Sequence, residues 1–215
     1  MIKNRIKGDL IIISGPSGCG KDTICCEIFK IRDNIVKSIS ITTRNKRQNE
    51  IDGKDYYFVT KDEFLEKIKN KELLEHAIVH GKDYYGTPKS KIIETLNSGK
   101  DIVLIIDIQG ALQIKDKYPE AIFIFILPPS MKELKNRLLN RGSETKESML
   151  RRFKSMYKEI NEINKYNYVV VNDDLKESVK KVNAIIESQK CRVDRIEELD
   201  INSIEEAIHE ELIDL

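Results

Sequence analysis

Residues 15–21 read GPSGCGK, and they stand directly after a short apolar run and directly before a helical pattern. The glycines allow the backbone to turn back, so that several N–H groups point into one concavity. The helix that begins near Lys21 contributes the positive end of its dipole, and the lysine supplies a mobile cation for the β- and γ-phosphates of a nucleotide. A GxxxxGK loop between a strand and a helix is a specific signal, so these residues predict a phosphate-cradling P-loop.

The residue after the lysine departs from this pattern. A Ser or Thr is expected there, because its hydroxyl binds magnesium, but the chain has Asp22 followed by Thr23. A carboxylate beside phosphates repels them unless a cation lies between. Asp22 therefore either binds Mg²⁺, directly or through water, while Thr23 contacts phosphate, or it only caps the helix N-terminus. The sequence leaves both interpretations open.

Apolar runs of strand length alternate with helical patterns along most of the chain. The runs are residues 10–14, 102–108, 121–127 and 168–171. Nearly continuous apolar strands are typical of a parallel sheet whose two faces are both covered by helices. The alternation therefore predicts an α/β fold.

Several helix boundaries are marked by capping residues. A Ser or Thr followed three residues later by Glu is a capping box, and a polar residue before Pro favours a helix start. The predicted starts are the boxes Thr60–Glu63 and Ser130–Glu133, the pair Thr87 and Pro88, and Asp174, and Gly99 is predicted to end the helix after Pro88.

Composition excludes some classes of function. The 215 residues hold 37 Lys and Arg against 36 Asp and Glu, so the formal charge of +1 does not indicate a basic face for nucleic acid. No apolar run reaches the roughly 18 residues that span a bilayer, so a cytoplasmic protein is expected. The four cysteines lack CxxC spacing and predict reduced thiols, and the three histidines form no zinc-ligand set.

Three stretches stand outside the alternation. Residues 37–88 are polar and tyrosine-rich and predict an inserted lobe, and residues 137–157 are highly charged and predict a mobile helical segment. The C-terminal segment, residues 191–215, is rich in acidic side chains, and it could pack on the core, mediate self-association or remain loose. Ser203 could cap a short final helix in it. The remaining residues, 1–36, 89–136 and 158–190, are assigned to the core. Nothing in the sequence indicates the oligomeric state.

Eight motifs carry a resemblance to a known family that runs from about Asp9 to about Gln189. They are GPSGCGKDT at 15–23, SITTR at 40–44 with Arg47, DGKDYYF at 52–58, Glu75, YYGTP at 84–88, IDIQG at 106–110, LPPS at 127–130 and VNDD at 171–174. Together they resemble the guanylate kinase family far more specifically than a P-loop alone. The resemblance implies a P-loop nucleoside-monophosphate kinase fold, in which a parallel sheet flanked by helices carries an inserted GMP-binding lobe and a helical lid.

The resemblance also implies which residues bind GMP. Arginine forks and phenolic hydroxyls suit a dianionic phosphate. A carboxylate that accepts from N1–H and the 2-amino group selects guanine, since adenine has neither donor. The implied phosphate ligands are Arg44, Arg47, Tyr56 and Tyr85, and the implied base ligands are Ser40, Glu75, Thr87 and Asp107. Since neighbouring strand residues face opposite ways, only one of Tyr56 and Tyr57 suits the site.

For ATP, the resemblance implies the P-loop, an adenine contact and a cationic lid. The ATP ligands would be Gly15, Pro16, Ser17, Gly18, Cys19, Gly20, Lys21, Asp22, Thr23 and Asn172, with Mg²⁺ bound beside the phosphates and Asp22 as its candidate ligand. The lid arginines would be Arg137, Arg141 and Arg152, and with Lys21 and Arg44 they form the implied catalytic set. The alternative for the lid residues is a solvated basic helix face.

Two positions depart from the family. Many relatives carry an acid where this chain has Ile105, so a second acidic contribution to metal or GMP binding is not expected. Residues 81–84 hold one residue more than is usual between the glycine and the tyrosine pair, which would shift the tip of that loop.

The implied reaction is in-line transfer of a phosphoryl group from ATP to GMP or dGMP. The GMP phosphate is already nucleophilic, so alignment and charge neutralisation suffice and no general base is needed. Residues 37–88 would close over GMP and exclude water. The alternatives are a catalytically weak binding module, against which Lys21 argues, and a kinase of a related acceptor such as a ribose bisphosphate.

Overall fold

The computed structural model describes residues 2–4, 7–79, 82–139, 156–199 and 208–209. Within these ranges the strands form one five-stranded, one four-stranded and one two-stranded sheet.

The five-stranded sheet is parallel throughout and has the order β10-β9-β2-β8-β3. Its strands come from the apolar runs that the sequence analysis identified, together with a short strand before the predicted lobe. They are β2 (Leu10–Ser14), β3 (Ile35–Lys37), β8 (Asp101–Ile105), β9 (Ile122–Leu127) and β10 (Tyr168–Val171). The strand predicted over 102–108 ends earlier, at Ile105, because Asp107 caps the following helix.

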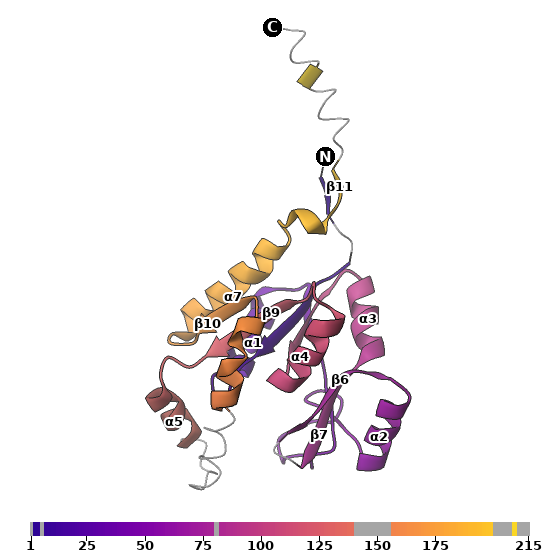
Figure 1. The fold of residues 1–215 in the computed structure, drawn as a ribbon, viewed down its shortest axis with the longest axis vertical. Coiled ribbons are helices and arrows are strands. Elements are labelled where there is room, and N and C mark those ends of the chain that lie inside the picture. Colours follow the sequence, from indigo (N-terminus) through magenta and orange to yellow (C-terminus); the bar gives the residue numbers. More distant parts are fainter. Residues whose placement is uncertain (1, 5–6, 80–81, 140–155, 200–207, 210–215) are drawn as a thin grey trace.

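Helices cover both faces of this sheet (Figure 1). Ile11 and Ile13 of β2 pack in one apolar cluster with α1 (Lys21–Ile31) and α7 (Leu175–Gln189). The alternate residues of β2 pack on the other face with α3 (Lys89–Asn97) and α4 (Ile108–Lys117). The predicted α/β fold is therefore confirmed.

The four-stranded sheet lies beside α3 and α4, together with α2 (Lys61–Lys69) (Figure 1). All of it falls within residues 37–88, where the sequence predicts a lobe, and its strand β6 packs against α4. The order is β5-β4-β7-β6, formed by β4 (Ile41–Thr42), β5 (Tyr57–Phe58), β6 (Leu73–Val79) and β7 (Asp83–Pro88). The limits of the lobe, core and lid stay predictions.

The capping predictions for α2 and α7 are confirmed. The Thr60 side chain accepts the N–H of Glu63, and the Glu63 carboxylate accepts the N–H of Thr60 at 2.7 Å. Asp174 accepts the N–H of Glu177 at 2.9 Å and so caps α7.

Only half of the second capping box forms, at the start of α5 (Met131–Leu139). Ser130 Oγ accepts the N–H of Glu133 at 3.1 Å. The Glu133 carboxylate accepts instead from Arg137 Nε, one turn later, at 2.9 Å. The Glu133 side chain, which would complete the capping box, instead forms an ion pair with Arg137 within the helix.

The helix predicted from Thr87 and Pro88 forms and begins one residue later, at Lys89, but Thr87 does not cap it. Both residues belong to β7, and Pro88 precedes α3 without a side-chain capping bond. The Thr87 hydroxyl donates to the buried carboxylate of Glu75 at 2.6 Å, because a buried carboxylate needs a donor. The predicted end of this helix is confirmed, since Gly99 has φ of 78° just after Ser98.

The segment after α7 contacts the core where the structure describes it. A short helical turn (Val193–Arg195) brings Arg195 to the Asp9 carboxylate, and Arg195 also donates to the carbonyl of Glu120 at 2.8 Å. Strand β11 (Ile196–Leu199) then pairs antiparallel with β1 (Ile2–Asn4). The helix predicted from Ser203 lies outside the described residues.

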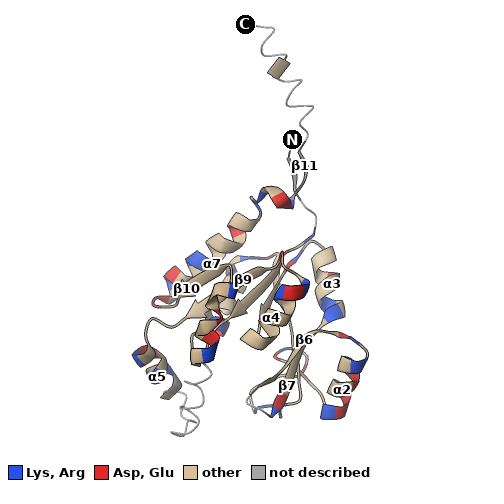
Figure 2. Ribbon diagram, viewed as in Figure 1, with Lys and Arg blue, Asp and Glu red and all other residues tan. Residues whose placement is uncertain are grey.

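Charged residues and cysteines are distributed over these elements as follows. Figure 2 shows basic and acidic residues interspersed along the helices. All four cysteines are free thiols, and Cys19 and Cys25 are buried. Over the described ranges, no helix is long and apolar enough to cross a membrane.

Candidate active site

The P-loop lies between β2 and α1, in backbone conformations that require glycine. Gly15, Gly18 and Gly20 have φ of 143°, 90° and 94°. A Cβ on Gly15 would lie 2.2 Å from the carbonyl oxygen of Ile126, so the loop passes directly against β9. The loop therefore takes a conformation that few other sequences could adopt.

Lys21 opens α1 and folds back over the loop. Its Nζ donates to the carbonyl oxygens of Gly15 at 2.5 Å and Pro16 at 3.1 Å. Burial raises the pKa of the neighbouring Cys19 thiol, which marks that residue as structural. Asp22 and Thr23 are exposed in the first turn of α1, beside the loop.

Asn172, which follows β10, supports the P-loop through a hydrogen bond. It is buried at the end of β10, and its Nδ2 donates to the carbonyl oxygen of Cys19 at 2.8 Å. A Cβ on Gly20 would lie 2.3 Å from the same Nδ2, so the loop and the amide are in close contact. Arg137 reaches this region from α5 and donates to the Asn172 carbonyl at 3.3 Å. Sequence reasoning expected Asn172 near adenine and missed this support of the loop.

A second polar cluster, formed by Arg44, Tyr56 and Tyr85, lies on the four-stranded sheet. Arg44 Nε donates to the Tyr85 hydroxyl at 3.0 Å, and the guanidinium lies 5.4 Å from the centre of the Tyr56 ring. The rings of Tyr56 and Tyr85 meet edge to face, with centroids 5.8 Å apart. A cation and two phenols thus converge, as a phosphate site requires.

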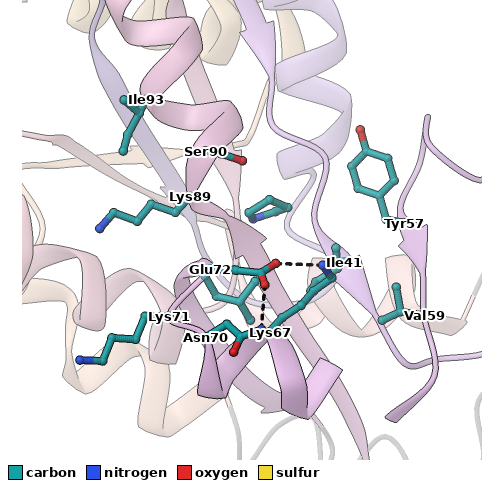
Figure 3. Close-up of a pocket in the computed structure, with 12 residues that line it drawn as sticks. Ile41, Tyr57, Val59, Lys67, Asn70, Lys71, Glu72, Lys89, Ser90 and Ile93 are labelled. Carbon is teal, nitrogen blue, oxygen red and sulfur yellow. Dashed lines mark hydrogen bonds and ion pairs between the residues drawn. The ribbon is translucent and has the colours of Figure 1, made fainter. Parts of the chain in front are cut away.

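Tyr57 lies on the opposite face of this sheet. It lines a pocket of about 590 Å³ between the sheet and α3, with Ile41, Val59 and Ile93 among the apolar residues there (Figure 3). This pocket lies away from the Arg44 cluster. Tyr56, which directly precedes β5, therefore lies beside Arg44, and Tyr57 does not.

Glu75 lies buried on β6, with 3% of its surface exposed. Its pKa is raised to about 7, mainly by burial and to a smaller extent by the nearby Asp107 carboxylate, while the hydrogen bond from the Thr87 hydroxyl lowers it. Asp107 caps α4 by accepting the N–H of Gly110 at 3.0 Å. A Cβ on Gly110 would lie 2.3 Å from Glu75 Oε2, so the α4 backbone closes one side of this carboxylate.

Glu50 belongs to the same region, although sequence reasoning missed it. Its carboxylate accepts from Arg44 Nη2 at 2.7 Å and from the backbone N–H of Arg47 at 2.8 Å. The hydrogen bond to Arg44 lowers the pKa of Glu50 below its usual value. The one available signal was an acidic residue three positions after Arg47, which is weak because loops are rich in charge.

The other predicted site residues differ in burial, and two of them are not described by the structure. Ser40 is half-buried just before β4, and Arg47 has an exposed side chain. Ile105 packs against the core at the end of β8. Arg141 and Arg152 lie outside the described residues. In the ranges that are described, no group of three or more His, Cys, Asp or Glu side chains could hold a metal ion.

The P-loop, Asp107 and Asn172 follow three strands of the parallel sheet, so they share its carboxyl edge. The chain leaves β2 toward β3 and β8 on one side and later adds β9 and β10 on the other. Ligands of open α/β sheets bind at such a change of direction. Sequence position and topology therefore place the phosphate loop where a nucleotide is expected.

Comparisons with known proteins agree with this geometry. The family model described as guanylate kinase matches residues 7–189. The chain is 59% identical over 208 residues to a guanylate kinase of Clostridium tetani, covering 97% of this chain and 99% of that protein. It is 55% identical over 213 residues to a guanylate kinase of Clostridium perfringens strain SM101, covering 99% and 98%.

A solved structure shares the fold. The crystal structure of guanylate kinase from Anaplasma phagocytophilum is similar to this chain with a TM-score of 0.76 and 35% identity, covering 92% of this chain and 93% of that one. The family match covers most of the chain, and the curated relatives extend over nearly all of it. The chain therefore belongs to the guanylate kinase family, the nucleoside monophosphate kinases that phosphorylate GMP with ATP.

Proposed function

We propose that this chain transfers the γ-phosphoryl group of ATP to GMP, and to dGMP, by in-line displacement between the P-loop and the four-stranded sheet. The observation that carries the proposal is the arrangement on that sheet. A buried carboxylate, Glu75, lies on the same sheet as the cationic and phenolic cluster of Arg44, Tyr56 and Tyr85. The first suits a guanine edge and the second suits a phosphate.

The guanine base would be bound around Glu75. In its ionised form the carboxylate accepts from N1–H and the 2-amino group of guanine, and the Thr87 hydroxyl that already donates to it at 2.6 Å fixes its orientation. Ser40 and Asp107 would complete the base site. Adenine has neither of these two donors and would leave the buried carboxylate with the Thr87 hydroxyl alone, which is a strong basis for rejection.

The GMP phosphate would be bound by Arg44, Arg47, Tyr56 and Tyr85. Arg44 already donates to the Tyr85 hydroxyl, so the phenol can turn its own hydrogen toward an incoming oxygen. The base and phosphate sites together would position the GMP phosphate as the nucleophile. No general base is required, because that phosphate is already ionised near neutral pH.

ATP would occupy the P-loop, residues 15–23, with its adenine near Asn172. Lys21 would exchange the carbonyl oxygens of Gly15 and Pro16 for the β- and γ-phosphates, since an ammonium bonds more strongly to anionic oxygens than to neutral ones. Arg137, with Arg141 and Arg152 of the proposed lid, would add positive charge to the transferring group.

The residues beside the loop fit Mg²⁺ bound mainly by the nucleotide. Magnesium commonly keeps several waters and takes one or two carboxylates in addition to phosphate oxygens. Asp22 supplies one exposed carboxylate next to the P-loop, and an all-protein metal site is not found among the described residues. When bound, the ion would neutralise charge on the β- and γ-phosphates. Asp22 does not cap α1, because the N-cap residue is Gly20 and no side-chain capping bond forms there. Its alternative role is therefore a negative charge beside the positive end of the helix dipole, without a metal.

Residues 37–88 would act as the GMP lobe, residues 137–157 as the lid, and the remainder to residue 190 as the core. Closure of the lobe and lid would exclude water and so suppress hydrolysis of ATP. We place the reaction in the cytoplasm, because all four cysteines are free thiols.

Product analysis tests this proposal. The protein is incubated with Mg-ATP alone and with Mg-ATP plus GMP, and nucleotides are separated and quantified. The expected result is formation of ADP and GDP in equal amounts only when GMP is present. ADP formation that does not depend on GMP, or no turnover with GMP, would contradict it.

A further inference from the structure

Glu50 uses both carboxylate oxygens to hold the loop between β4 and β5. One oxygen accepts from Arg44 Nη2 at 2.7 Å, and the other accepts from the backbone N–H of Arg47 at 2.8 Å. The Glu50 N–H in turn donates to the carbonyl oxygen of Arg47 at 3.2 Å. Glu50 therefore ties its own turn to the side chain of one arginine and the backbone of the other.

The ion pair with Arg44 is shielded from solvent. Arg44 and Glu50 expose only 14% and 16% of their side chains. The pKa of Glu50 is lowered by the hydrogen bond from Arg44, so the carboxylate stays ionised near neutral pH. Such a pair restricts an arginine more than an exposed ion pair does.

The bonds of Arg44 leave donors available for a ligand. A guanidinium has five N–H groups. In Arg44, Nε donates to the Tyr85 hydroxyl, one Nη1–H to the Asn45 carbonyl and one Nη2–H to Glu50. Three of the five are thus used, and one remains on each terminal nitrogen. A planar fork held in this way can offer both remaining hydrogens to phosphate oxygens at once.

We propose that Glu50 is a positioning residue for the acceptor phosphate, because it fixes the Arg44 fork and the Arg47 backbone before the substrate arrives; this inference rests on the proposed function. Removal of the Glu50 charge has two opposing effects. The positive charge of the site rises, which favours a dianion. Arg44 also loses its fixed orientation, and that loss dominates, since two-point recognition depends on geometry.

The variant Glu50→Gln tests the inference with two ligands. GMP probes the base and phosphate sites together, and guanosine probes the base site alone. A charge-assisted hydrogen bond is lost, so GMP affinity and kcat/KM for GMP should fall roughly ten- to a hundredfold. Guanosine affinity and KM for ATP should stay within about twofold of the wild-type values.

Glu72→Gln provides the matched control. Glu72 pairs with Lys67 at 3.0 Å in the same lobe, but this exposed pair lies at the pocket on the opposite face of the sheet (Figure 3). The control should leave GMP binding unchanged. An equal loss of GMP affinity in both variants would overturn the inference, because it would reflect a general effect of charge on the lobe.

Three further results would overturn it. Unchanged GMP affinity in Glu50→Gln would show that Glu50 does not position the phosphate ligands. Tighter GMP binding would show that Glu50 competes with the phosphate for Arg44. An equal loss of guanosine affinity would show that Glu50 only maintains the fold of the lobe. Failure of the wild-type protein to use GMP would instead contradict the proposed function, so the two claims fail separately.

Discussion

Individual residues in this site owe their chemistry to burial and to close backbone contacts. Glu75 would be an ordinary acid in solvent, but burial raises its pKa to about 7. The sequence predicted Glu75 only through a family resemblance, because a lone glutamate carries no local signal. Its bond from Thr87 and the close approach of Gly110 depend on neighbours that are distant in the chain.

The pKa of Glu75 predicts a pH dependence for guanine binding. Recognition of N1–H and the 2-amino group requires the carboxylate, and the ligand-free protein protonates this group as the pH falls through about 7. Affinity should therefore decrease on acidification, approaching a tenfold loss for each pH unit well below the pKa. Guanosine is the ligand of choice, because a phosphate group itself titrates near pH 6. Guanosine affinity that stays constant from pH 8 to pH 6 would contradict this account.

Gly110→Ala should weaken GMP binding without unfolding the protein. An added Cβ would lie 2.3 Å from Glu75 Oε2, so the carboxylate must move. Alanine otherwise favours a helix interior by roughly 0.5–1 kcal/mol relative to glycine. Steady-state kinetics should show KM for GMP raised at least about tenfold with KM for ATP unchanged, as expected for loss of a geometry-dependent contact.

Gln109→Ala, at the preceding exposed position of α4, is the control for Gly110→Ala. It should leave both KM values unchanged. If Gly110→Ala behaves in the same way, the close contact between α4 and Glu75 does not govern guanine binding.

Elements whose signals are local were predictable from the sequence. Continuous apolar runs predict the buried strands. Thr60 and Glu63 predict the capping box of α2, because the two residues that bond each other lie only three positions apart in the chain. Thr87 was misjudged, because its hydroxyl has a buried partner from another strand. Glu50 was missed for the same reason, since the Arg44 bond depends on how the loop folds.

Asn172→Ala tests how β10 supports the P-loop. The substitution removes the 2.8 Å bond to the Cys19 carbonyl, so the loop loses a fixed point. Loss of one neutral hydrogen bond should weaken ATP binding by roughly 1 kcal/mol, or about fivefold, with GMP binding unchanged. Titration with inorganic triphosphate separates two roles. Support of the loop predicts equal weakening for ATP and triphosphate, whereas weakening of ATP alone would show that Asn172 acts through adenine.

At the scale of the whole molecule, the four-stranded sheet is joined to the core along α4. The Gln113 side-chain amide donates to the His76 carbonyl at 2.6 Å and accepts the backbone N–H of His76 at 3.2 Å. The Lys117 ammonium donates to the Leu74 carbonyl at 3.0 Å. These bonds fix the edge of β6 while the far side of the sheet carries Arg44 and Tyr56. The proposed acceptor site therefore lies on the side of this sheet away from its joint with α4.

GMP should rotate the four-stranded sheet toward the P-loop. Closure brings the acceptor phosphate to ATP and excludes water, and the α4–β6 contact should change least because it lies at the joint. Crystal structures with and without GMP, superposed on the five-stranded sheet, measure the rotation. Identical positions of the four-stranded sheet in the two structures would contradict closure.

Glu75 and the Arg44 cluster should together select GMP as the acceptor of a phosphoryl group held by the P-loop. The most direct measurement is kcat/KM with ATP for GMP, dGMP, AMP, UMP and ribose 1,5-bisphosphate under one set of conditions. GMP and dGMP should exceed AMP by roughly 10⁴-fold, because AMP lacks both base donors that the buried carboxylate would accept from. A preference for AMP or for the bisphosphate would contradict the account.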